Sequence, residues 1–349
     1  MSKNLSELGG RKGVLENLFS KIGDASAAAE GSPSPEDMER LAEEFLVGNA
    51  NVYGTATFYD FLRPENKGKK VYVCNGSACL CAGTQEGLIE DLKERFKPDE
   101  IGHMTCLGRC HENGAFHYAG KNYSALGDGQ LDAVLNGGEE MNVDRYAMQS
   151  QGESVLMAEF PGMDSYSALL KTALAKDSSE VLDDVKAAGI RGRGGAGFPM
   201  GVKWEFARNT ESNLKFIICN ADEGDPGAYS DRYLLEERPH AVLFGMMIAA
   251  YCMKAQWGVL YIRAEYPESF PIVEAAIQDF RDAGLLGENV NGAGFDFDFK
   301  IVPGQGSYIC GEETALISSI EGQRPEVRVR PPFPAQKGLF NKPTIVNNV

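Results

Sequence analysis

The sequence predicts an α/β protein in which a helical N-terminal segment precedes two layered domains. Two observations carry this prediction. From about residue 70, short apolar runs alternate with helix-length amphipathic segments, a pattern that favours parallel strands covered by helices. Glycine-rich or acidic stretches follow several of these runs, at the positions where layered sheets bind their ligands. At 349 residues the chain is long enough for two or three domains with substantial cores.

Composition and charge narrow the class of protein. The formal net charge of −16 disfavours nucleic acid and anionic membrane surfaces as partners. The opening stretch, MSKNLSELGGRKG, is polar and unlike a signal peptide. The longest apolar run, residues 241–253, is too short to cross a bilayer and predicts a buried helix. Eight cysteines without an export signal favour a reducing compartment, so we expect a cytoplasmic protein with no direct membrane insertion.

Residues 1–66 are expected to form a flexible N-terminus followed by a helical segment. Residues 23–35 (GDASAAAEGSPSP) are small, polar and interrupted by proline, which predicts a flexible linker. The apolar spacing over residues 36–45 predicts an amphipathic helix, with Ser34 as its N-cap.

Residues 67–142 are expected to form the first layered domain. The pattern predicts in order a strand at 71–73, a helix at 87–96, a strand at 101–105, a hairpin at 116–126 and a helix at 131–135. This order is typical of a thioredoxin-like fold. The stretch 136–142 (NGGEEMN) predicts a domain boundary.

Residues 143–349 are expected to form a longer, Rossmann-like α/β domain. The predicted strands are residues 155–160, 214–219, 258–263 and 295–302. The predicted helices are residues 166–174, 181–188, 240–253 and 270–283. Strands separated by helix-length segments imply parallel pairing.

Four cysteines form two tight pairs, each following a short apolar run: Cys74, Cys79, Cys106 and Cys110. Four thiolates suit an iron–sulfur cluster or zinc. Structural zinc usually uses a shorter C-x2-C spacing than the C-x4-C and C-x3-C seen here, so the sequence favours a 2Fe–2S cluster. Two disulfides are the alternative, which the absence of any sign of secretion disfavours.

Two neighbours of the quartet offer other ligand sets. Cys81 lies two residues after Cys79 and is a candidate spare ligand. His111 follows Cys110, as in a Rieske-like site, but such a site needs a second suitably paired histidine. We expect His111 to tune the site from beside the ligands or simply to be exposed to solvent.

Residues 189–203 (GIRGRGGAGFPMGVK) form a glycine-rich segment. The spacing of Gly192, Gly194 and Gly197 formally matches the dinucleotide fingerprint, but that fingerprint must follow a strand and the preceding residues are helical. So many glycines predict a nest of backbone N–H groups for a phosphate, with cationic side chains beside it. A mobile surface loop is the alternative. Phe198 and Phe206 could stack on a flat ring or belong to the core.

Two further segments follow predicted strands. In residues 220–227, Asn220 and Asp222 are placed to hydrogen-bond ribityl or ribose hydroxyls, although a plain turn is the alternative. Residues 304–316 open a helix whose two early glutamates have a simpler interpretation, complementing the helix dipole. Cys310 is expected to be a small buried residue.

Four ordered stretches carry a resemblance: GIRGRGGAGFPMGVKWEF, CNADEGDPGAYSDR, GQGSYICGEETALISSIEGQRP and PPFPAQKGLFNKPTIVNNV. They resemble the NADH-binding flavoprotein subunit of respiratory complex I and its relatives in soluble hydrogenases and NAD-dependent formate dehydrogenases. YGTATFYDFL and the cysteine pairs in CNGSAC and CLGRC resemble the small 2Fe–2S subunit of the same enzymes. The chain thus looks like a fusion of the two subunits.

The resemblance implies site residues and cofactors. It implies FMN contacts at Gly192, Gly194, Lys203, Asn220, Asp222, Glu223, Gly311, Glu312, Asn347 and Asn348. It implies that NADH stacks on the flavin beside Gly195, Phe198, Phe206, Tyr308 and Glu313. Asp225 stands where many relatives carry glutamate near the NADH adenosine, and a carboxylate there repels the extra phosphate of NADP. We therefore expect a preference for NAD.

The expected function is that of a diaphorase within a larger complex that supplies further iron–sulfur and catalytic subunits. Hydride passes between NAD(H) and FMN and electrons leave singly to clusters, so no side chain is expected to act as a catalytic acid or base. The alternative is the reverse reaction, NAD reduction with electrons from a formate dehydrogenase or hydrogenase partner. A non-catalytic subunit and a zinc scaffold are less favoured. Relatives continue beyond Val349 into a region expected to hold a 4Fe–4S cluster.

Overall fold

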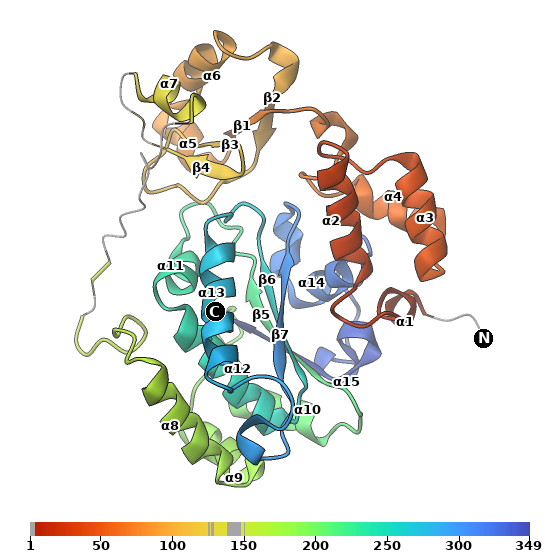
Figure 1. The fold of residues 1–349 in the computed structure, drawn as a ribbon, viewed down its shortest axis with the longest axis vertical. Helices are drawn as coiled ribbons and strands as arrows, with labels where there is room; N and C mark the ends of the chain where they lie inside the picture. Colours follow the sequence, from red (N-terminus) through yellow and green to blue (C-terminus); the bar gives the residue numbers. More distant parts are fainter. Residues whose placement is uncertain (1–3, 125, 127–128, 138–147, 150) are drawn as a thin grey trace.

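The computed structural model describes residues 4–124, 126, 129–137, 148–149 and 151–349. Figure 1 shows two β-sheets, a small one in the upper part of the view and a larger one at the centre. Their strand orders are β2-β1-β3-β4 and β7-β6-β5-β8. The α/β class expected from the sequence is therefore confirmed.

The small sheet is the predicted thioredoxin-like unit. Its strands are β1 (Val71–Cys74), β2 (Ile101–Met104), β3 (Phe116–Tyr118) and β4 (Lys121–Tyr123). β1 pairs parallel to β2 and antiparallel to β3, and β3 and β4 form the expected hairpin. Its helices are α5 (Ser77–Ala82), α6 (Gln85–Lys93) and α7 (Gln130–Leu135). The predicted strands and helices all recur here within a few residues. Only α5, the short helix that contains Cys79, was not predicted.

The large sheet contains four parallel strands: β5 (Phe216–Ala221), β6 (Trp257–Ile262), β7 (Asp298–Pro303) and β8 (Thr344–Asn348). The chain runs outward from β5 to β6 and β7, then returns to place β8 on the other side of β5. The strand order therefore reverses at β5. In open α/β sheets, ligands bind beyond the carboxyl ends of the strands at such a reversal.

Two strands of this region differ from the sequence prediction. The strand expected at 155–160 is wrong: these residues form no strand, and Val155 and Leu156 are 77% and 69% exposed. An apolar run without a neighbouring strand or a core against it gains nothing from becoming extended. Conversely, β8 was not predicted, because the short run that forms it is recognisable only once it pairs with β5.

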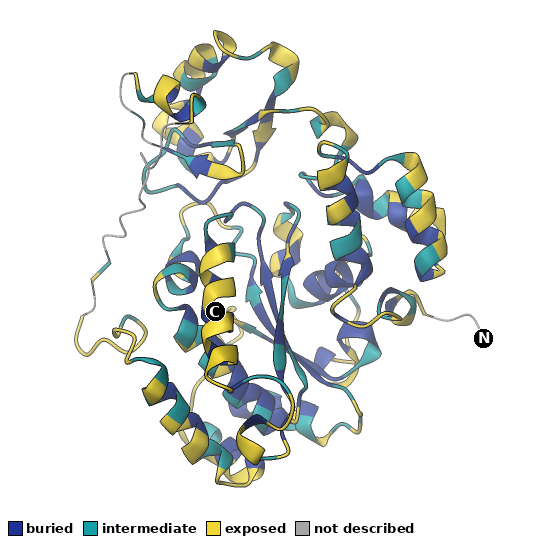
Figure 2. Ribbon diagram, in the orientation of Figure 1, coloured by how far each residue is buried: buried dark blue, intermediate teal, exposed yellow. Residues whose placement is uncertain are grey.

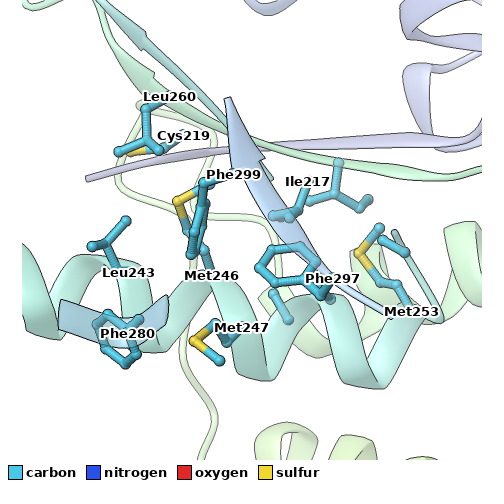
Figure 3. Packing of buried hydrophobic residues seen from close by; sticks show 14 of the residues in the cluster. Ile217, Cys219, Leu243, Met246, Met247, Met253, Leu260, Phe280, Phe297 and Phe299 are labelled. Atoms are coloured by element: carbon cyan, nitrogen blue, oxygen red, sulfur yellow. The ribbon is translucent and has the colours of Figure 1, made fainter. Parts of the chain in front are cut away.

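Six helices cover one face of the large sheet: α8 (Met163–Leu174), α9 (Ser178–Ala187), α10 (Met200–Asn209), α11 (Ser230–Glu237), α12 (Pro239–Met253) and α13 (Ser269–Asp282). Figure 3 shows α12 laying Leu243, Met246 and Met247 against side chains from the strands. Alternate residues of β5, such as Ile217 and Cys219, face this layer. The buried helix expected at 241–253 is confirmed as part of α12.

The opposite face of the large sheet is covered by α14 (Glu313–Ile320) together with the N-terminal helices. These are α1 (Leu5–Gly9), α2 (Leu18–Ala28), α3 (Pro35–Phe45) and α4 (Asn49–Ala56). Leu18 and Phe19 share a core with Phe216 and Ile218 of β5. Figure 1 shows α2 to α4 lying beside α14 rather than beside the small sheet.

The flexible linker expected at 23–35 is wrong over its first half. Residues 23–28 continue α2, and Ala25 is buried in the shared core. Alanine is the strongest helix former, and its small side chain lets the helix pack closely. The small residues that suggested a flexible linker therefore allow α2 to pack closely against its neighbours. The N-cap at Ser34 is confirmed, since its hydroxyl oxygen accepts a hydrogen bond from the Asp37 N–H at 3.0 Å.

The remaining short elements are α15 (Pro334–Lys337) and 3₁₀ turns at Pro64–Asn66, Pro98–Glu100, Val290–Gly292, Tyr308–Gly311 and Leu339–Asn341. Figure 2 shows the strands of the large sheet buried between the two helical layers. Within the described ranges, no helix combines the length and apolar character needed to span a membrane. The expected domain boundaries at 66 and 142 stay predictions, and most of the stretch 136–142 lies outside the described residues.

Candidate functional site

The glycine-rich segment forms an open loop between two helices, α9 and α10. The Gly192 N–H donates to the Phe198 carbonyl at 2.9 Å, which closes the loop at its base. Gly195 and Gly197 have φ angles of +103° and +59°, which side chains with a Cβ rarely adopt. Among the described residues, no atom lies within 4 Å of a Cβ built at either position. As expected, this is no strand-to-helix Rossmann turn, but its backbone is free for a close approach by an anion.

The end of β8 and the loop after β5 meet this glycine loop. Asn220 pairs in register with Asn348, and the Asn348 side-chain oxygen accepts a hydrogen bond from the Arg193 N–H at 3.4 Å. The Asn220 amide donates to the Gly311 carbonyl at 2.8 Å. The start of α14 is therefore joined to the same place. Four segments that are far apart in the sequence converge at the reversal of strand order.

Lys203, on α10, lies at the centre of these segments. Its ammonium group donates to the Val346 carbonyl at 2.6 Å and lies 3.3 Å from the Glu313 carboxylate. Arg330 forms ion pairs with Glu312 and, at 3.3 Å, with Glu313. Two cations thus compensate the two glutamates. Arg330 was missed because it lies in an irregular segment, where periodicity carries no signal.

Two of the expected FMN contacts also serve the fold. The Glu312 carboxylate caps α14 by accepting from the N–H groups of Thr314 and Ala315 at 2.8 and 2.9 Å, so the helix-terminus interpretation of this glutamate is correct. Glu223 accepts from the Asp231 N–H at 3.1 Å at the start of α11 and from the Tyr266 hydroxyl at 3.1 Å. Their contacts with FMN stay predictions.

Asp222 presents a polar atom that the fold leaves unsatisfied. Its Oδ2 oxygen is sealed from solvent and has no hydrogen-bond partner in the described part of the chain. Burial, together with the nearby Glu265 carboxylate, raises the pKa of Asp222 to about 8, against an opposing effect of Arg263. A Cβ built on Gly311 would lie 3.5 Å from the Asp222 carbonyl, an ordinary van der Waals distance, so the backbone at Gly311 packs beside Asp222. An orphaned carboxyl beside glycine backbone fits a hydroxyl-rich ligand such as the ribityl chain of FMN.

The aromatic side chains expected to flank a flat ring are on the surface. Phe198, Phe206 and Tyr308 are 47%, 55% and 70% exposed, which excludes a core role. The Tyr308 hydroxyl donates to the Asp225 carboxylate at 2.9 Å. A Cβ built on Gly224 would lie 2.8 Å from the Tyr308 ring, so these two loops are in contact.

The Asn347 side chain is hydrogen-bonded to a buried tryptophan. With its amide oriented to satisfy its neighbours, its oxygen accepts from the Trp204 indole N–H at 3.3 Å. Trp204 is 4% exposed and lies on α10, one residue after Lys203. The sequence prediction missed Trp204, which fixes β8 to the helix that carries Lys203.

The two cysteine pairs lie in the small sheet's domain, at the end facing the large sheet. The sulfurs of Cys106 and Cys110 are 3.5 Å apart. A hydrogen bond from the Cys74 thiol lowers the pKa of Cys79 to about 6. A hydrogen bond from Cys110 does the same for Cys106, also to about 6, with help from Arg263. The same two hydrogen bonds raise the pKa of Cys74 and of Cys110, so each pair favours one thiolate, the form that binds a metal, beside one thiol.

The two cysteine pairs have the arrangement that a binuclear cluster uses. A 2Fe–2S cluster takes its four protein ligands as two pairs, one for each iron. The Gly76 N–H lies 3.4 Å from the Cys74 sulfur, a contact typical of iron–sulfur ligands. The residues present thus fit the cluster expected from the sequence.

The two alternative ligands lie in different surroundings. Cys81 is exposed, and its role as a spare ligand stays a prediction. The His111 ring packs against Tyr229, with 4.8 Å between ring centroids. Cys310 is 1% exposed in the core that α14 shares with the N-terminal helices, as expected of a small buried residue.

Comparisons with known proteins agree with this geometry. Residues 185–349 match the family described as "Nuo51 FMN-binding domain", and residues 23–139 match "Thioredoxin-like [2Fe-2S] ferredoxin". The HndC component of the NADP-reducing hydrogenase of Solidesulfovibrio fructosivorans is 52% identical over 192 residues, covering 54% of this chain and 39% of its own length. A component of the NADH-quinone oxidoreductase of Salmonella typhimurium is 44% identical over 205 residues, covering 58% of this chain and 46% of its own length.

Other relatives match almost the whole chain. The alpha subunit of the NAD-reducing hydrogenase HoxS of Cupriavidus necator is 36% identical over 340 residues, covering 89% of this chain and 56% of its own. A crystal structure of a NAD+-reducing [NiFe]-hydrogenase, in the air-oxidized state, superposes with a TM-score of 0.79 at 28% identity, covering 99% of this chain and 60% of that one.

The chain spans about half the length of the curated relatives it matches. Within that span, both cofactor-binding domains are present in order. Residues 185–349 thus match the Nuo51 FMN-binding domain family and residues 23–139 the thioredoxin-like [2Fe–2S] ferredoxin family, with the two matched regions joined in one polypeptide.

Proposed function

We propose that this chain is the diaphorase module of a multi-subunit redox complex, transferring hydride between NAD(H) and FMN and passing single electrons to iron–sulfur clusters. The observation that carries the proposal is the convergence of four loops where the strand order of the large sheet reverses. FMN, when bound, supplies the chemistry by accepting two electrons with the hydride and releasing them one at a time.

The residues of the chain bind and orient the cofactors in this proposal. The N–H groups around Gly194 and the Lys203 ammonium hold the phosphate. Asn220 and Asp222 bond the ribityl hydroxyls, and the exposed aromatic rings line the nicotinamide side. Because Arg330 and Lys203 compensate Glu312 and Glu313, the site tolerates the negative charge of reduced flavin better than two bare carboxylates would.

The physiological direction has two candidates. The first is NADH oxidation, as the name of the NADH-quinone oxidoreductase relative describes. The second is NAD reduction with electrons from a hydrogenase or formate dehydrogenase partner. The second candidate draws support from the relative that aligns over 340 residues, a subunit of an NAD-reducing hydrogenase. In both we propose further iron–sulfur and catalytic subunits as partners, in the cytoplasm.

Preference for NAD over NADP rests on Asp225. The relatives' names point both ways, because one hydrogenase is described as NADP-reducing and another as NAD-reducing. A carboxylate at the adenosine end repels a 2′-phosphate, and Tyr308 holds this carboxylate in place. We therefore propose NAD.

The test is an absorption spectrum of anaerobically purified chain, with flavin and iron quantified. We expect about one FMN and two irons per chain, as the two family assignments imply, and bleaching of both absorptions on addition of NADH. Colourless protein after reconstitution, or zinc in place of iron, would overturn the proposal.

A further inference from the structure

Arg263 joins the cluster domain to the flavin domain at their contact. It follows the last residue of β6 and is 3% exposed. Its Nη2 donates to the Cys106 carbonyl at 2.6 Å and lies 3.1 Å from a Glu265 oxygen. Its Nη1 donates to the Glu223 carbonyl. One guanidinium therefore bonds the carbonyl of Cys106, a proposed cluster ligand, and the carbonyl of Glu223. Glu223 lies in the loop after β5 (residues 220–223), which we call the flavin loop.

The packing around Arg263 leaves it little freedom. Its guanidinium carbon lies 4.9 Å from the centroid of the Tyr266 ring. On the cluster side, a Cβ built on Gly108 would lie 2.2 Å from that ring, and Gly108 has a φ of +73°. Only glycine fits there, so the loop of residues 106–110, which we call the cluster loop, packs directly against the Tyr266 ring. A buried guanidinium between an aromatic face and two carbonyls is held in one position.

The same loops also have an uncharged connection. The Asn122 amide donates to the Leu107 carbonyl at 3.1 Å and to the Glu265 carbonyl at 2.6 Å. Asn122 is 2% exposed. Asn122 and Arg263 therefore both bridge the two domains, but of these two only Arg263 brings a charge and a bond to the Glu223 carbonyl.

We propose that Arg263 is a positioning residue for both cofactors: it fixes the flavin loop through Glu223 and places a buried positive charge beside the cluster loop through Cys106. This inference rests on the proposed function, in which Cys106 binds the cluster and residues 220–223 contact FMN. Reduction adds one negative charge to the cluster, and a nearby cation stabilises that charge. Removing the cation also leaves the Glu265 carboxylate uncompensated, which acts in the same direction. Loss of Arg263 therefore makes the cluster harder to reduce.

The test compares four variants of the intact chain loaded anaerobically with FMN and iron–sulfur cluster: Arg263→Gln, Arg263→Lys, Asn122→Ala and Arg281→Gln. Arg281 forms an ion pair with Asp298 at 2.9 Å and is 41% exposed, so its substitution removes one charge and one surface ion pair. The cluster midpoint potential is measured by redox titration followed by electron paramagnetic resonance, and FMN affinity by flavin fluorescence.

We expect R263Q to move the midpoint potential to a more negative value and to weaken FMN binding by about 10-fold, the loss of one charge-assisted hydrogen bond. R263K keeps the charge, so its potential stays near that of the unmodified chain. Its FMN binding weakens, because one ammonium cannot bridge two carbonyls as the guanidinium does. N122A lowers thermal stability and R281Q does not, and neither changes potential or FMN affinity.

Two outcomes overturn the inference. If N122A shifts the midpoint potential and the FMN affinity as much as R263Q does, loosening of the contact between the domains is responsible. If R263K, the variant expected to fold best of the two, leaves FMN affinity unchanged, Arg263 does not position the flavin loop. Failure of the proposed function would be visible separately, as unmodified chain that takes up neither FMN nor iron.

Discussion

The hydroxyl of Tyr308 donates a hydrogen bond to the carboxylate of Asp225 at 2.9 Å. These residues belong to loops that follow different strands, and both side chains are exposed at the edge of the proposed nucleotide site. The pair fixes a negative charge where a dinucleotide would lie. The preference between NADH and NADPH therefore tests the role that we propose for Asp225.

We expect Asp225→Asn to raise kcat/KM for NADPH by about 10-fold or more while changing that for NADH little, because removing one charge relieves on the order of 1–4 kcal/mol of repulsion at an exposed site. Steady-state assays with both nucleotides measure this. Glu274→Gln, an exposed carboxylate on α13, is the charge-matched control. Equal efficiency with NADH and NADPH in the unmodified chain would contradict the assignment.

Lys203→Gln is expected to weaken FMN binding by about 10-fold or more, since a charge-assisted bond to phosphate or carbonyl contributes roughly 1.5–3 kcal/mol. Flavin content after gel filtration and fluorescence titration report the loss. Lys176→Gln, which removes a surface ion pair with Asp184 at 2.6 Å, should retain FMN fully. If the Lys203 variant retains FMN, Lys203 does not bind the phosphate.

The Asp222 carboxyl predicts a pH dependence of stability in the chain stripped of FMN. Its folded pKa of about 8 lies above the unfolded value of 3.8, so the folded state binds the extra proton between these values. Stability is therefore fully present below about pH 4 and falls as pH rises toward 8, by at most ~1.4 kcal/mol per pH unit. Asp222→Asn removes this contribution. Urea unfolding of both proteins between pH 5 and 9 measures the free energy of unfolding, and the two values should diverge as pH rises. If they change in parallel, the Asp222 carboxyl makes no such contribution.

The cysteine quartet is tested by single serine substitutions. Cys79→Ser and Cys106→Ser should each abolish the cluster, because each variant deprives one iron of one of its two protein ligands. Cys81→Ser is the matched control: its thiol is exposed and only two residues from Cys79. Iron and acid-labile sulfide analysis measures the result. Loss of iron from the Cys81 variant would mean that the ligand set is wrong.

The N-terminal helices are expected to be part of the flavin domain's core. The Phe19 ring is fully buried and lies 5.0 Å from that of Tyr59 and 6.3 Å from that of Tyr261 on β6. Phe19→Ala should lower the free energy of unfolding by about 3–5 kcal/mol. Leu15→Ala, at a side chain that is 55% exposed, should change it by less than about 1 kcal/mol. A small effect of Phe19→Ala would contradict this role and favour the flexible N-terminus that the composition suggested.

Sequence reasoning proposed a role for a residue only where the pattern around that residue was informative by itself. The cysteine spacing, the glycine density around Gly194 and the polar residues after β5 all indicate chemistry without knowledge of the fold. The same rule applied to β6 would have found Arg263 and Glu265, which follow that strand as Asn220 and Asp222 follow β5. Trp204 and Arg330 offered no such signal, because their partners lie over 15 residues away in the chain.

By itself the sequence predicted most of the element types and the parallel character of the large sheet, since these depend on short-range periodicity, and its motifs supplied the proposed cofactor ligands. Only the tertiary structure decided that residues 4–56 cover one face of the flavin sheet, that β8 completes the site, and that Arg263 joins the two domains. Those outcomes depend on which buried surfaces meet, a long-range free energy that no local window of residues contains.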